Sequence, residues 1–183
     1  MDLWAAGLQL LESHPIFGVG FNRMADYAGL TAHNSVVVCA AELGLFGLFF
    51  WSFFLFPTVR DTLAIASSNK VTEPDPNFQE VSPFPGVIAK VQTFDKAEIN
   101  RYGRLVLLSL TGFLVAGWFL SRAFIMTLFL LGGFAEVIFE MALRRGMISP
   151  RLPFQRVLAS AGVMCIALVV LTYIVLRFGN LMR

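Results

Sequence analysis

The chain has 183 residues, of which 57% are hydrophobic and 14% are charged, and its formal net charge is +2. Soluble domains carry about 25% charged residues, so this sequence has too little polar surface for a soluble globule, and its small net charge gives no reason to expect a nucleic-acid partner. The composition therefore predicts an all-α integral membrane protein with about four transmembrane helices.

The predicted elements begin with an N-terminal segment, residues 1–35, that precedes the first long apolar run. Residues 2–13 have the pattern of a short amphipathic helix, and Trp4 is suited to the membrane interface. Pro15 disfavours the helical conformation at His14, so we expect this helix to end there.

Four apolar runs are long enough, or nearly so, to cross a membrane, which takes about 20 residues. They are residues 36–56, 105–120, 123–143 and 157–176. Only Ser121 and Arg122 separate the second run from the third, and the two are predicted to form a tight helical hairpin. Cys39 and Cys165 lie inside the runs, and we expect two buried thiols and no metal site.

Two polar loops connect these runs. Residues 57–104 contain five of the eight prolines and balanced charges, which predicts a flexible connector with an amphipathic piece, residues 87–102, on the membrane surface. Residues 144–156 carry four arginines and no acidic residue. Loops rich in arginine stay in the cytoplasm, so both loops are predicted to be cytoplasmic and residues 1–35 to lie on the outer face.

Three acidic residues lie within the apolar runs. Glu42 is inside the first run, where an ionised group needs a partner, and we expect that partner to be a residue missing from this chain. Glu136 and Glu140 are one helical turn apart, and Arg144 follows Glu140 by four residues. That spacing predicts an ion pair at the membrane interface.

The N-terminal segment contains both histidines of the chain, His14 and His33. Between them, Gly18 and Gly20 permit a tight turn whose backbone N–H groups can receive an anion. The same residues also fit a loop that simply re-enters the interface, so both interpretations stay open at this point.

The second histidine stands directly before the first apolar run, where Asn34 or Ser35 is a plausible helix cap. At 100° per residue, the helix face below His33 carries Val37, Ala40, Gly44 and Gly47. Small residues let a neighbouring helix approach closely, so Gly44 and Gly47 are predicted to form a packing seam beneath an imidazole held at the membrane surface. That imidazole is either structural or catalytic.

These segments together resemble the O-antigen ligase and polymerase superfamily. The resemblance is carried by Trp4 with Leu10 and Leu11, by His-Pro-Ile-Phe-Gly-Val-Gly-Phe at residues 14–21, and by His-Asn-x9-Gly-x-x-Gly at residues 33–47. It covers roughly residues 3–56. It implies a glycosyltransferase-C-like helical bundle, present here only in part, since the chain is expected to be the C-terminal portion of a larger or split protein.

The resemblance also implies a function. Such proteins transfer a glycan from undecaprenyl pyrophosphate to an acceptor at the periplasmic face of the bacterial inner membrane, without a cofactor or metal; for ligases the acceptor is the lipid A core. The family's functional histidine corresponds to His33, which would orient or deprotonate the acceptor hydroxyl. Weaker substrate-binding candidates are Asn34, His14, Gly18, Gly20 and Arg23.

Other functions are compatible with the same sequence. An O-antigen polymerase or a protein O-oligosaccharyltransferase would carry the same motif and use another acceptor. A non-enzymatic membrane subunit, completed by a separate chain that supplies the remaining helices, is the alternative from a different class. In each case the expected partners include membrane lipid, and this chain alone is expected to be inactive.

Overall fold

The computed structural model describes residues 2–68, 96–120 and 126–181, and every regular element in these residues is a helix. The helices are α1 (Asp2–Ser13), α2 (Met24–Ala28), α3 (Ser35–Ala66), α4 (Lys96–Phe119), α5 (Met126–Arg144) and α6 (Phe154–Leu181). Four of them, α3 to α6, are long and apolar enough to cross a membrane. The protein is therefore an all-helical, multi-pass membrane protein, as the composition predicts.

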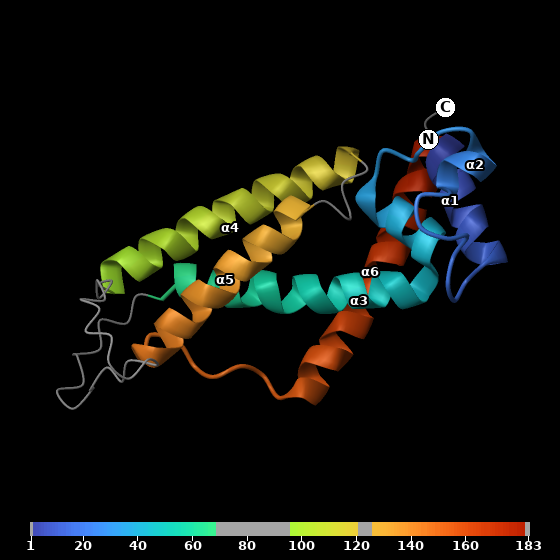
Figure 1. Cartoon of the computed structure of the whole chain (residues 1–183). Coiled ribbons are helices and arrows are strands. Elements are labelled where there is room, and N and C mark those ends of the chain that lie inside the picture. Colours follow the sequence, from blue (N-terminus) through green and yellow to red (C-terminus); the bar gives the residue numbers. More distant parts are fainter. Residues whose placement is uncertain (1, 69–95, 121–125, 182–183) are drawn as a thin grey trace, which may run out of the picture.

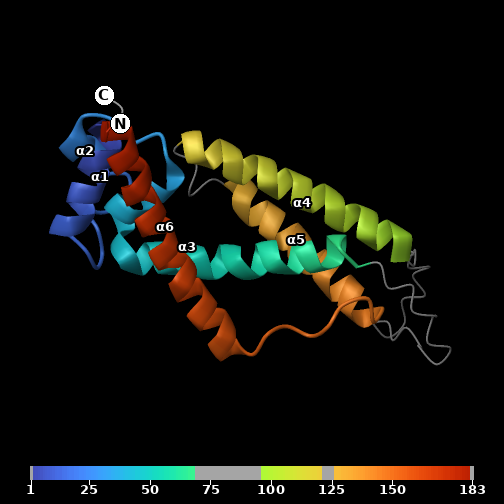
Figure 2. The ribbon, with the colours of Figure 1, turned by 180° about the vertical axis from the view of Figure 1, so that it is seen from behind.

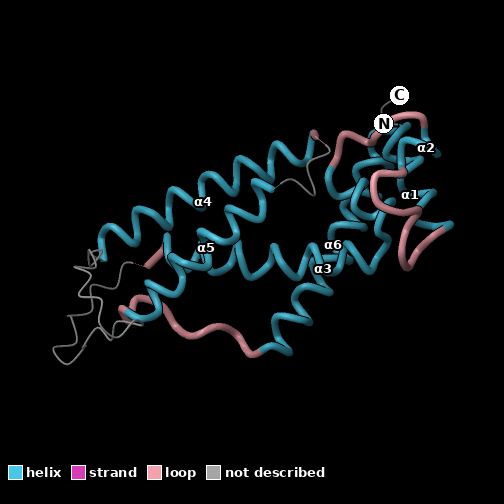
Figure 3. The backbone as a smooth tube through the Cα atoms, in the orientation of Figure 1, coloured by secondary structure: helices cyan, strands magenta, loops and turns pink. Residues whose placement is uncertain are grey.

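Helix α3 is the centre of the structure and contacts α1, α4, α5 and α6. Figure 1 shows α4 running above α3 and both α5 and α6 crossing α3, and the reverse view in Figure 2 shows the same crossings. The beginning of α1 and the end of α6 lie close together, at the end where α3 begins (Figure 1). In Figure 3 the connection between α5 and α6 passes along the other end.

The long helices extend beyond the predicted runs. Helix α3 continues through Pro57 to Ala66, so the predicted loop at residues 57–104 begins too early. A proline removes one backbone hydrogen bond and need not end a helix when neighbouring groups compensate. Here the hydroxyls of Thr58 and Thr62 add hydrogen bonds to the carbonyls of Phe54 and Thr58, one turn earlier in the same helix.

That loop also ends earlier than predicted, because α4 begins at Lys96. The predicted amphipathic piece at residues 87–102 therefore belongs to α4 from Lys96 onward, and its earlier part lies outside the described residues. The hairpin of α4 and α5 is present, with the two helices in contact. Its turn, with Ser121 and Arg122, lies outside the described residues.

Close approach between helices depends on glycines other than those predicted. A Cβ on Gly103 or Gly117 of α4 would lie 2.5 Å from Ile65 or 3.3 Å from Ser35 of α3, and one on Gly132 of α5 would lie 2.3 Å from Phe54. Membrane helices use small residues in this way to bring their backbones together. The seam predicted for Gly44 and Gly47 thus forms at other positions, with α3 as the receiving helix.

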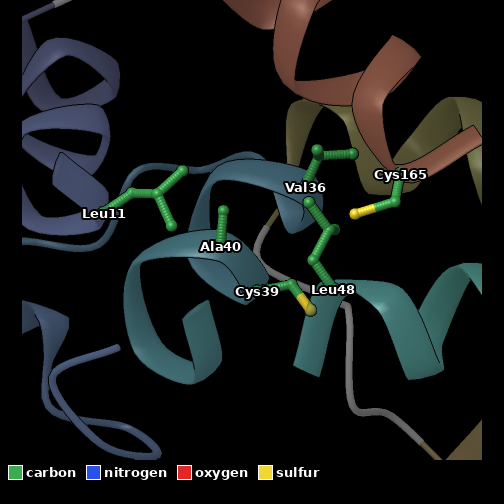
Figure 4. Close-up of a cluster of buried hydrophobic side chains, with 6 residues drawn as sticks. All are labelled: Leu11, Val36, Cys39, Ala40, Leu48 and Cys165. Atoms are coloured by element: carbon green, nitrogen blue, oxygen red, sulfur yellow. The ribbon is translucent and has the colours of Figure 1, made fainter. Parts of the chain in front are cut away.

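A buried apolar cluster joins the N-terminal part of α3 to α1 and α6 (Figure 4). It contains Leu11, Val36, Cys39, Ala40, Leu48 and Cys165. Both cysteines are buried free thiols, as predicted. The cluster fixes the end of α3 on which the histidine motif stands.

Candidate functional site

The first span is a broken helix. Gly44 has φ 65° and ψ −165°, which interrupts α3 nine residues after it begins. A break of this kind frees backbone carbonyls before it and N–H groups after it, and in an apolar environment each unpaired group is costly. The parts of α3 before and after Gly44 therefore need another segment to complete their hydrogen bonds.

The segment that completes them is the loop at residues 15–20. The N–H groups of Leu45 and Phe46 donate to the carbonyls of Pro15 (2.9 Å) and Ile16 (3.1 Å). In the other direction, the N–H groups of Val19 and Gly20 donate to the carbonyls of Ala41 (3.0 Å) and Glu42 (2.9 Å). The two sequence motifs are thus hydrogen-bonded to each other, backbone to backbone, around the break in α3.

Three glycines make this contact possible. Gly18 and Gly44 both have positive φ, and a Cβ on either would lie 2.4 Å from backbone atoms of the opposite segment. Gly47 stands one turn further on, and a Cβ there would lie 2.1 Å from the side chain of Leu43. The Gly-x-x-Gly pattern therefore serves the break itself, and the prediction that Gly44 and Gly47 receive a neighbouring helix is wrong.

The turn at Gly18 and Gly20 forms as predicted, but its backbone does not face a ligand. The N–H of Gly18 donates to the carbonyl of His14 at 3.0 Å, and that of Gly20 is used by Glu42. These donors are consumed within the protein. Of the two interpretations that the sequence left open, these hydrogen bonds favour the loop packed at the interface over the anion-receiving turn, because tertiary contacts with α3 satisfy N–H groups that an anion would need.

Glu42 also finds its partners within the chain, contrary to the prediction that they are missing. Its two carboxylate oxygens accept hydrogen bonds from the N–H groups of Asn22 (2.9 Å) and Met24 (3.3 Å), and the residue is only 3% exposed. Met24 is the first residue of α2, whose N-cap, Arg23, makes no side-chain capping bond. Glu42 supplies that cap from α3.

Asn34 acts as the cap of α3, as predicted. Its side-chain oxygen accepts from the N–H groups of Val36 (2.9 Å) and Val37 (3.0 Å). Its side-chain amide donates to the carbonyl of Trp118 at 3.0 Å, and the hydroxyl of Ser35 donates to the carbonyl of Leu120 at 2.8 Å. The N-terminal end of α3 is thereby tied to the C-terminal end of α4, and the fully buried Asn34 uses both ends of its side chain for structure.

His33 stands at the edge of this junction with an exposed side chain. Its φ is +47°, a conformation that residues other than glycine adopt rarely and that often marks functional positions. The preceding residue is held by Trp4, whose indole N–H donates to the carbonyl of Ala32 at 2.8 Å. Trp4 packs edge-to-face on Trp118, with ring centroids 5.9 Å apart. The backbone on both sides of His33 is therefore fixed while the imidazole faces outward.

Arg23 lies beside a buried apolar cluster that also adjoins His33. Met24 follows Arg23 in the sequence, and Ala32 precedes His33. Both Met24 and Ala32 belong to one buried cluster, which also contains Val37, Val38 and Ala41. Arg23 and His33 therefore emerge from the edge of a common apolar patch. The side chain of Arg23 is 60% exposed and lies 3.5 Å from Asp26, an exposed ion pair that a stronger anion can displace.

His14 is not part of this arrangement. It follows the last residue of α1, and its ring contacts the hydroxyl of Ser13 at 3.0 Å. Trp4, which holds Ala32, is ten residues earlier, about 15 Å along the helix axis. The structure therefore separates the two histidines and brings His33 together with Trp4, Trp118 and the end of α4. Sequence reasoning assigned Trp4 to the membrane interface and did not single out Trp118, because nothing in the spacing of the sequence indicates that they meet.

Comparisons with known proteins give no assignment. No protein-family model, no curated protein and no solved structure matches the chain.

Proposed function

We propose that this chain forms the acceptor-activating end of an O-antigen ligase-like glycosyltransferase, which moves a glycan from undecaprenyl pyrophosphate to an acceptor hydroxyl, that of the lipid A core. The observation that supports this most directly is the exposed His33 at φ +47°, held between Trp4, the cap of α3 and the end of α4. The motif resemblance at residues 14–21 and 33–47 supplies the chemical class.

In the proposed reaction, the imidazole of His33 orients the acceptor hydroxyl and accepts its proton. The oxygen then forms a bond to the anomeric carbon of the glycan as the bond from that carbon to the pyrophosphate oxygen breaks. Undecaprenyl pyrophosphate leaves with the bonding electrons. Arg23 is the nearest candidate in sequence and packing to hold the pyrophosphate, because a guanidinium can grip two phosphate oxygens at once.

The proposal includes a location: the bacterial inner membrane, with the α1–α2 end in the periplasm. Ten of the fourteen lysines and arginines, six in residues 57–104 and four in residues 144–156, then face the cytoplasm. This asymmetry is the usual determinant of orientation. It puts His33 on the side where lipid-linked glycans are used.

The test is complementation of a deletion of the gene in its own bacterium with the wild-type gene, His33→Ala or His14→Ala. We expect His33→Ala to lower transfer per molecule by on the order of 10²–10⁴ while membrane abundance stays near normal. His14→Ala is the matched control and should leave transfer unchanged. The readouts are the lipopolysaccharide ladder, the accumulation of lipid-linked glycan, and protein abundance by immunoblot.

Two outcomes contradict the proposal. If deletion of the gene leaves glycan transfer intact, the protein does not catalyse the proposed reaction. Deletion that abolishes transfer, combined with normal activity of His33→Ala, indicates a non-enzymatic subunit of a transferase.

A further inference from the structure

At the opposite end of α3 from His33, one arginine connects three parts of the protein. Arg151, in the loop between α5 and α6, donates from Nε to the carboxylate of Asp61 at 2.8 Å and from its terminal nitrogen to Glu136 of α5. Its guanidinium also lies 4.3 Å from the ring centre of Phe139. The hydrogen bond to Glu136 raises the pKa of Arg151 above its ordinary value, so the residue carries its charge at every physiological pH.

The two carboxylates differ in access. Asp61 is 3% exposed and is further neutralised by Arg60, whose guanidinium nitrogen lies 2.7 Å away. The Glu136 side chain is 50% exposed and has only Arg151 as an ion-pair partner among the described residues. An incoming group would therefore meet Glu136 and Arg151 together, a negative and a positive charge side by side.

A cavity of about 680 Å³ opens onto this pair. Its charged wall is Asp61, Glu136 and Arg151, and most of its remaining lining is apolar, including Phe53, Phe54, Phe129 and Phe154. Phe53 precedes Asp61 by eight residues, about 12 Å along α3, and Phe129 precedes Glu136 by seven, about 10 Å along α5. In α3 the ring lies near the middle of the helix and Asp61 toward its end, whereas in α5 Phe129 lies in the first turn and Glu136 near the middle. On both helices the aromatic ring and the charge are thus separated by about two turns.

This graded lining matches one kind of amphiphile. Apolar walls of this size accept an acyl chain, and the charged mouth accepts a headgroup that carries both signs. An ammonium group with N–H donors suits Glu136, and a phosphate suits Arg151. Choline lacks the N–H donors, and glycerol lacks the positive charge, so neither complements the pair fully.

We propose that this cavity is a binding site for a phospholipid with a primary ammonium headgroup, phosphatidylethanolamine, whose ammonium contacts Glu136 and whose phosphate contacts Arg151. The site lies at the end of the bundle opposite His33 and does not depend on the glycan-transfer proposal. Its occupant would hold α3, α5 and the start of α6 together at that end of the bundle.

The test measures lipid binding to the whole chain purified in detergent, by native mass spectrometry with dioleoyl phosphatidylethanolamine, phosphatidylcholine and phosphatidylglycerol. We expect phosphatidylethanolamine to bind about tenfold more tightly than either other lipid, as one additional charged hydrogen bond would give. Glu136→Gln should remove this preference. Since Glu136 is half exposed, its replacement leaves the fold intact, which circular dichroism checks.

A second variant tests the cavity itself. Gly133 lines the cavity, and a Cβ there meets nothing within 4 Å, so the side chain of Gly133→Leu begins in open space at the cavity wall. It should weaken binding of phosphatidylethanolamine about tenfold. Gly112→Leu on α4, where a Cβ is equally unobstructed, is the matched control and should bind normally. Equal affinity for the three lipids, or unchanged binding in Gly133→Leu, would overturn the proposal.

Discussion

The carboxylate of Glu42 in α3 caps helix α2 by accepting a hydrogen bond from the N–H of Met24 at 3.3 Å. The second carboxylate oxygen accepts from Asn22, which has φ +56°. One acidic side chain inside the first span thus holds the segment on which Arg23 stands. The hydrogen bond between Glu42 and Met24 joins residues eighteen positions apart in the sequence. Its removal should release the segment that carries Arg23.

We expect Glu42→Gln to lower the free energy of unfolding by about 1–3 kcal/mol, because an amide nitrogen would face one of two buried N–H donors. The measurement is thermal unfolding of the detergent-solubilised chain. Glu140→Gln is the control: its pair with Arg144, predicted from the sequence and present at 3.9 Å, is exposed and should contribute little. Equal destabilisation by both variants would argue against the capping role.

The break in α3 gives a graded series of glycine variants. Gly44→Ala introduces both an unfavourable positive φ and a clash at 2.4 Å, whereas Gly29→Ala has positive φ with open space. We expect Gly29→Ala to cost about 1–2 kcal/mol and Gly44→Ala clearly more, whereas Gly112→Ala, inside helix α4, should cause no loss of stability. Abundance in membranes and unfolding temperature provide the readouts. A Gly44→Ala protein as stable as Gly29→Ala would show that the loop does not pack against the break.

Replacement of Asn34 by Asp separates the local cap from the tertiary contact. Asp and Asn are equally good N-caps, so the sequence alone predicts no effect. In the structure the amide of Asn34 donates to the carbonyl of Trp118 at the C-terminal end of α4, where a carboxylate would be buried beside the negative end of that helix. We expect a loss of about 1–3 kcal/mol. Unchanged stability of Asn34→Asp would contradict the junction.

The orientation can be tested with single cysteines in a background of Cys39→Ala and Cys165→Ala. Tyr27→Cys and Ser149→Cys replace exposed residues at opposite ends of the bundle. A membrane-impermeant maleimide, applied to cells with a permeable outer membrane, should label position 27 and leave position 149 unlabelled. Labelling of position 149 alone would reverse the proposed topology.

The sequence alone was sufficient to predict the membrane class, the four spanning helices, the amphipathic helix α1 and a cap at Asn34 or Ser35, of which the structure uses Asn34. Each of these depends on residues close together in the chain: apolar runs longer than a bilayer requires, a proline after His14, and a polar side chain before a hydrophobic run. The ion pair of Glu140 and Arg144 is of the same kind, since residues four apart on a helix always face each other.

Only the tertiary structure decided what the glycines and Glu42 do. Spacing along the chain placed Gly44 on a smooth helical face, but that face does not exist, because α3 breaks there and the loop at residues 15–20 takes over its hydrogen bonds. The same loop uses N–H groups that an anion could otherwise have received, and the residues that follow it, Asn22 and Met24, supply the partners of Glu42. In an apolar environment every backbone polar group must be paired. Which groups pair across such a distance in sequence depends on packing, and no local pattern encodes it.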